Sequence, residues 1–153
     1  MRSFSLEPLS GIRGSIRFGM KREEVRRTLA PAIPRPFSRG TTEVDGFYDS
    51  SVQVSYGKMD EVTFLEFARN RENQVLLDGF DLMGSPAASV INYLKSRFEV
   101  IDDEMEPGYS FRLPTMEIGL WRSVVPSTDA DVEGRYFESV GFGTVGYYST
   151  KNG

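Results

Sequence analysis

The chain has 153 residues, of which 22 are acidic and 18 are basic, giving a formal net charge of −4, and it contains neither cysteine nor histidine. This composition excludes disulfides, thiolate metal sites, Ser-His-Asp chemistry and most zinc chemistry. We therefore expect a non-enzymatic protein without catalytic residues, metal or cofactor.

The first half of the chain predicts a β-α-β-β unit. Alternating apolar residues indicate a short strand over 15–20, and apolar residues four apart indicate a helix over 21–29. The prolines of segment 33–36 predict an extended loop, because proline cannot continue a helix. Two further runs of alternation, 52–56 and 62–67, predict a hairpin that turns at Gly57 to Asp60.

The second half predicts a similar order of elements. A strand over 79–84 precedes Ser85-Pro86, a pair typical of a helix start with serine as the N-cap. Val90, Leu94 and neighbouring apolar residues then form the buried stripe of a helix. Four more strands are predicted: 109–113, 116–120, 136–140 and 144–148.

Spacing indicates that the two halves repeat one unit. Three residues of the first half recur 65 positions later: Gly19, Val25 and Leu29 as Gly84, Val90 and Leu94. We predict the α+β class, with two tandem β-α-β-β units of about 12–70 and 76–149 inside a single compact domain, 1–153. Because each helix has one apolar stripe, the two helices are expected to pack on one side of an antiparallel sheet.

Charge is unevenly distributed along the chain. Residues 1–40 hold nine basic and three acidic side chains, whereas 41–153 hold nine basic and nineteen acidic ones. The acidic majority would repel phosphate, so we expect no nucleic-acid partner. The start of the sequence has no apolar run long enough for a signal peptide or a membrane span, which predicts a cytoplasmic protein without a membrane partner.

Two groups of residues are candidates for contact with a partner. The first is an acidic loop that holds Asp102, Asp103, Glu104 and Glu106. Such a cluster can be a solvated loop, tune pKa values for acid-base work, hold a hard cation or meet a basic protein surface. The second group consists of aromatic residues near strand ends, where they can serve as anchors in an interface: Trp121, Tyr147 and Tyr148.

The segment Gly141 to Gly146 matches the G-x-G-x-x-G pattern of dinucleotide-binding folds. That pattern requires a helix and a second parallel strand after the glycines. Only seven residues follow Gly146, and Tyr147 and Tyr148 favour a strand. We therefore expect no dinucleotide site.

Segment Ile16 to Val25, IRFGMKREEV, resembles the strand-glycine-helix signature of small bacterial β-α-β-β units such as the SmpA/OmlA lipoproteins. The duplicated form resembles the layout of β-lactamase inhibitory protein, whose concave sheet grips an enzyme. Together with GFDLMG, IGLWRS and GYY further along, the segment is similar to an uncharacterised family of cytosolic bacterial proteins. This resemblance implies an immunity or accessory protein of a polymorphic toxin system.

These observations lead to two hypotheses about function. The first is a protein that binds another protein through its acidic loop and aromatic residues; in its specific form, it is an immunity protein that neutralises a basic toxin domain. The alternative is a small-ligand binding protein or an unrecognised enzyme, with a site between sheet and helices.

Overall fold

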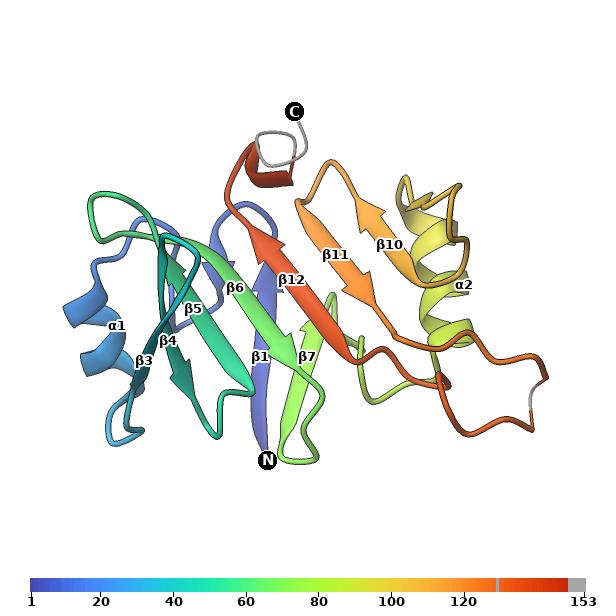
Figure 1. Ribbon diagram of the computed structural model, residues 1–153, viewed down its shortest axis with the longest axis horizontal. Helices are drawn as coiled ribbons and strands as arrows, with labels where there is room; N and C mark the ends of the chain where they lie inside the picture. Colours follow the sequence, from blue (N-terminus) through green and yellow to red (C-terminus); the bar gives the residue numbers. More distant parts are fainter. Residues whose placement is uncertain (129, 149–153) are drawn as a thin grey trace.

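A computed structural model describes residues 1–128 and 130–148 (Figure 1). The described residues are mostly β-sheet, with two helices, which confirms the α+β class. Their strands form two sheets, one of eight strands and one of four.

The large sheet is antiparallel throughout and has the strand order β3-β4-β5-β6-β12-β11-β10-β9. At its centre β6 pairs with β12, so that Phe67 lies opposite Val140. This pairing joins the first half of the chain to the second. The strands span β3 Arg35–Arg39, β4 Thr42–Phe47, β5 Val52–Tyr56, β6 Val62–Ala68, β9 Ile101–Asp102, β10 Ser110–Leu113, β11 Ile118–Trp121 and β12 Ser139–Gly143.

A small sheet with the order β2-β1-β7-β8 lies behind the large one (Figure 1). Its strands span β1 Arg2–Glu7, β2 Gly11–Ile12, β7 Asn73–Leu77 and β8 Phe80–Asp81. The central pair, β1 and β7, is parallel, with Phe4 opposite Val75. The rings of Phe4 and Phe67 lie 5.5 Å apart and connect the two sheets. The predicted architecture lacked this second sheet.

The core forms on one face of the large sheet. Helix α1, Arg22–Leu29, and helix α2, Ala87–Arg97, contribute buried apolar side chains to it. These side chains belong to the same buried cluster as Leu65, Phe67 and Val140 of the large sheet. Because side chains alternate along a strand, their neighbours in sequence point to the opposite face. We call that opposite face the open face.

A buried ion pair fixes α1 to the large sheet. The Asp45 carboxylate is fully buried and accepts two hydrogen bonds from Arg26, at 2.8 and 2.9 Å. The Tyr56 hydroxyl donates a third hydrogen bond to Asp45, at 2.9 Å. The carboxylate on β4 is thus bound from the helix and from β5, as expected for a buried charge.

Several predicted elements are confirmed and several are wrong. Helix 22–29 and the hairpin of β5 and β6 are as predicted. Segment 15–20 forms turns and one isolated bridge instead of a strand, and the expected loop at 33–36 leads into β3 at Arg35. Because β3 is an edge strand, Pro36 needs no ladder hydrogen bond from its nitrogen.

The ends of the second half also differ from the prediction. Ser85 does not cap α2, whose N-cap residue is Pro86, with no side-chain cap. Asp81 instead accepts hydrogen bonds from the Met83 and Gly84 amides in the turn before the helix. Residues 144–146 form a bend and a turn, and Tyr147 and Tyr148 are helical, instead of a closing strand. No helix of the described residues is long and apolar enough to cross a membrane.

Candidate functional site

Strand register places four side-chain positions in one row across the open face. Glu66 on β6 lies opposite Gly141 on β12, which lies opposite Gly119 on β11. Gly119 in turn lies opposite Arg112 on β10. The row therefore has a carboxylate at one end, a guanidinium at the other and two positions without side chains between them. Because Gly141 and Gly119 have no side chains, the sheet surface is lower in the middle of the open face than at the two ends of the row.

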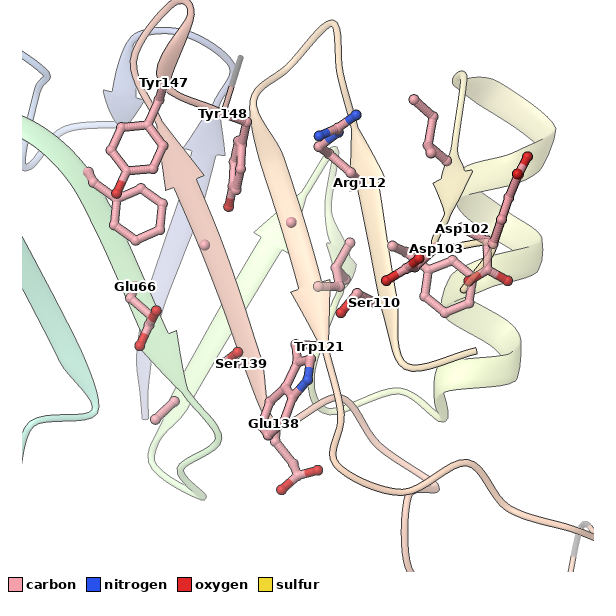
Figure 2. A pocket seen from close by; sticks show the side chains of 18 of the residues that line it. Glu66, Asp102, Asp103, Ser110, Arg112, Trp121, Glu138, Ser139, Tyr147 and Tyr148 are labelled. Carbon is pink, nitrogen blue, oxygen red and sulfur yellow. The ribbon is translucent and has the colours of Figure 1, made fainter. Parts of the chain in front are cut away.

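A groove of about 1190 Å³ runs over this row, and we call it the open-face groove (Figure 2). Its walls come from β6, β10, β11, β12, the acidic loop and the last described residues of the chain. The side chains that line the groove include Phe64, Glu66, Asp103, Glu104, Ser110, Arg112, Trp121, Glu138, Ser139, Tyr147 and Tyr148.

Tyr147 and Tyr148 pack against three glycines of the large sheet, namely Gly119, Gly141 and Gly143. A Cβ added to Gly141 would lie 2.5 Å from the Tyr148 hydroxyl oxygen, and one added to Gly119 would lie 2.8 Å from it. A Cβ on Gly143 would lie 2.5 Å from the Cβ of Tyr147. These distances are shorter than van der Waals contact, so the tyrosine positions require glycine in the strands beneath them.

Backbone hydrogen bonds hold this return of the chain. At the end of β12, the Gly143 amide donates to the Glu117 carbonyl at 2.8 Å, and beyond the strand the Tyr148 amide donates to the Glu117 carboxylate at 2.9 Å. Gly146, with φ of 78°, allows the turn between them. The G-x-G-x-x-G pattern is thus accounted for by ring packing and a turn.

The aromatic rings of the groove contact one another. The ring of Tyr147 stacks on Phe64, with centroids 4.3 Å apart and an interplanar angle of 11°. Tyr148 meets Tyr147 edge to face at 5.4 Å. Burial raises the pKa of both tyrosine hydroxyls, and the charge of Glu66 contributes in the same direction. The phenols are therefore neutral near pH 7.

The groove is negatively charged. It is lined by five acidic residues, Glu66, Asp102, Asp103, Glu104 and Glu138, and by two arginines, Arg39 and Arg112, a formal charge of −3. Glu138 lies beside Trp121 (Figure 2), and its Oε2 accepts a hydrogen bond of 2.8 Å from the hydroxyl of Ser123. A basic group would find opposite charge at several points along this surface.

The acidic loop is only partly a loop. Asp102 belongs to β9, and its Oδ1 accepts a hydrogen bond from the Gly108 amide at 2.9 Å. Asp103 and Glu104 are exposed and line the groove, whereas Glu106 is exposed but does not line it. The structure thus gathers six of the seven predicted partner-binding residues in one groove and leaves Glu106 outside it. Their binding role stays a prediction.

Trp121 and its neighbour Arg122 have different environments. Trp121 is 45% exposed and faces the groove (Figure 2), whereas Arg122, the first residue after β11, is buried. The Arg122 guanidinium donates to the carbonyl oxygens of Gly108 at 2.8 Å and Gly134 at 2.9 Å. Burial lowers the pKa of Arg122. This arginine holds the acidic loop and the 122–138 connection in place behind the groove.

Sequence reasoning missed Glu66, Arg112 and the glycines as members of the site. A signal was present for Glu66, because it lies between the apolar residues Leu65 and Phe67 of a predicted strand and so must face away from the core. Among the described residues, no group of three acidic, histidine or cysteine side chains is placed to hold a metal ion.

Comparison with protein-family models, with curated proteins and with solved structures finds no match for the chain. The family resemblance drawn from the sequence stays a prediction.

Proposed function

We propose that the protein is a non-enzymatic binding protein whose open-face groove receives a basic region of another protein. The observation that carries the proposal is the presence of five acidic residues and an exposed tryptophan in one groove. Tryptophan carries a disproportionate share of binding energy at interfaces. Opposite charge accelerates association and aligns the two partners. In its finer form, the proposal is a cytoplasmic immunity protein that neutralises a basic toxin domain.

The shape of the groove favours a macromolecule over a small ligand. Small-ligand pockets usually measure about 300–1,000 Å³ and enclose most of the ligand. The groove reaches about 1190 Å³ along a sheet face. Two of its apolar residues remain exposed, Trp121 at 45% and Ile101 at 38%. Such residues are better covered by the surface of another protein.

The two-unit architecture is part of the same proposal. Along the described chain, a strand pair, a helix and four strands occur in this order twice, from β1 to β6 and from β7 to β12. The order supports two units that meet at the pairing of β6 with β12. On this view the groove lies over the second unit and the junction between the two.

Affinity capture from a lysate of the source cells, at low and high salt, tests the proposal. The groove variant is Asp103→Lys/Glu104→Lys, and a second variant is Trp121→Ala. The matched control is Glu23→Lys/Glu24→Lys, which makes the same change in charge on exposed positions of α1, outside the groove. Circular dichroism melts verify that each variant is folded.

A basic protein held at low salt by the wild type and by the control, released at high salt and lost by both groove variants, would support the proposal. Mass spectrometry then identifies the partner and shows whether it is a toxin. Capture that is equal for the wild type and both groove variants would assign binding to another face. Retention of no protein by the wild type would refute the proposal as stated.

A further inference from the structure

One part of the groove already holds a ligand-like group, namely the ring of Tyr148. The ring of Tyr148 stands over the large sheet (Figure 2), and its hydroxyl oxygen is the atom nearest to a Cβ added at Gly119 or at Gly141. Side chains on these two residues would occupy the place of the hydroxyl. The two glycines therefore form a seat for one flat side chain, which we call the glycine seat.

The edges of the glycine seat suit a phenol. Glu66 and Arg112 lie on either side of Tyr148 (Figure 2) and end the row that contains the two glycines. The carboxylate can accept a hydrogen bond from a phenol, and the guanidinium can donate one to its oxygen. Phe64 adds an aromatic wall, with its centroid 6.1 Å from that of Tyr148 at an angle of 80°. A phenylalanine ring could form neither hydrogen bond.

Tyr148 differs from a core tyrosine of the same protein. Tyr56 is 3% exposed, and its hydroxyl donates to the buried Asp45. Tyr148 is only half-buried and lies on the open face, beyond the last residue of β12. Its amide is bound to the side chain of Glu117 and not to the strand ladder. Displacement of Tyr148 from the seat would therefore break no hydrogen bond of the strand ladder.

We propose that the glycine seat is a binding subsite for a tyrosine side chain of the partner, and that Tyr148 fills it in the free protein. The inference rests on the proposed function, because it places a partner in the same groove. The partner's tyrosine and Tyr148 then compete for one position. The apparent dissociation constant of the partner equals its intrinsic value divided by the fraction of molecules whose seat is open.

The first test uses p-cresol as the probe, because it is the tyrosine side chain with a hydrogen atom in place of the bond to Cα. The full-length Tyr148→Ala variant leaves the seat empty, and p-cresol should bind to it. At ten times its dissociation constant, p-cresol should raise the melting temperature by about 3–6 °C. It should leave the wild-type melting temperature unchanged. Toluene, which lacks the hydroxyl, should bind the variant at least several-fold more weakly.

Two further variants control this test. Tyr148→Ala/Gly119→Ala places a methyl group in the seat, at a position whose nearest neighbours in the wild type are all atoms of Tyr148, and should abolish the response to p-cresol. Glu117→Gln retains the shape of the side chain but weakens the hold on the Tyr148 amide, because a neutral acceptor replaces a charged one. It should bind p-cresol about tenfold more tightly than the wild type does. This variant keeps the inference testable if Tyr148→Ala does not fold.

The inference fails if p-cresol shifts the wild type and Tyr148→Ala equally, or shifts neither Tyr148→Ala nor Glu117→Gln. These outcomes need no partner, so they are distinguishable from a failure of the proposed function. Once a partner is identified by capture, Tyr148→Ala should bind it more tightly than the wild type does. Weaker binding would make Tyr148 a direct contact and would overturn its role as a competitor.

Discussion

The buried pair of Arg26 and Asp45 predicts an asymmetric response to mutation. Asp45 is 0% exposed, whereas the Arg26 side chain is 37% exposed. Arg26→Met removes both hydrogen bonds from Arg26 and leaves a buried carboxylate with only the hydrogen bond from Tyr56. Breaking a buried pair in this way costs about 3–5 kcal/mol. Because water reaches the vacated side, we expect the lower end, about 3 kcal/mol.

The reverse change should cost less. Asp45→Asn keeps the shape of the side chain and leaves a guanidinium that can turn toward water, so we expect a loss of about 1–2 kcal/mol. The double variant Arg26→Met/Asp45→Asn has no buried charge at this position and should be more stable than Arg26→Met alone. Asp60→Asn is the matched control, since its pair with Arg22 is more exposed and is worth about 1 kcal/mol or less.

Urea unfolding followed by circular dichroism measures these differences as changes in the free energy of unfolding. At about 2–4 °C per kcal/mol, Arg26→Met should also lower the melting temperature by about 6–12 °C. The reasoning is refuted if Asp45→Asn costs as much as Arg26→Met, or if Arg26→Met costs no more than Asp60→Asn. Either result would mean that the unpaired, buried Asp45 carboxylate is not the main cost of breaking the pair.

Three further predictions concern stability. Burial and the charge of Asp45 raise the pKa of Tyr56, so the folded state keeps a proton that the unfolded chain releases above about pH 10. The free energy of unfolding should therefore fall between pH 10 and 12. Measured by urea unfolding, this fall with pH should be less steep for Tyr56→Phe than for the wild type. Arg122→Met leaves two backbone carbonyl oxygens without their donor and should cost about 2 kcal/mol, with faster protease cleavage in the acidic loop. Gly134→Ala should lower the melting temperature more than Gly40→Ala does, since both have positive φ but only the Cβ on Gly134 would meet a carbonyl oxygen, at 2.0 Å.

Local patterns predicted those parts of the fold that depend on neighbours in the sequence. The α1 helix follows from Val25 and Leu29 four residues apart, and the hairpin of β5 and β6 follows from alternation around a turn. The parallel pairing of β1 with β7 joins residues 71 positions apart. Phe4 and Leu6 alternate as in a strand, but no local pattern reveals which strand they join.

In the candidate site, too, features that depend on residue type alone were predicted, and features that depend on strand pairing were not. Residue type was enough to select the acidic loop and Trp121, because charge and exposed aromatics are visible in any sequence. The seat of Tyr148 depends on the register of β11 against β12, which brings Gly119 opposite Gly141. High β-propensity led to the prediction of a strand at Tyr147 and Tyr148. The turn at Gly146 overrides that propensity.

Each sheet contains a pairing between strands that lie about 70 residues apart in the sequence: β1 with β7 in the small sheet, and β6 with β12 in the large one. A cut in the exposed 69–72 connection would separate β1 from β7 and β6 from β12. Each fragment would then expose two unpaired strand edges, a condition that favours aggregation when a fragment is made alone. Co-expressed, the fragments offer each other the missing edges. The protein should therefore reconstitute by fragment complementation, with Trp121 fluorescence as a reporter of assembly.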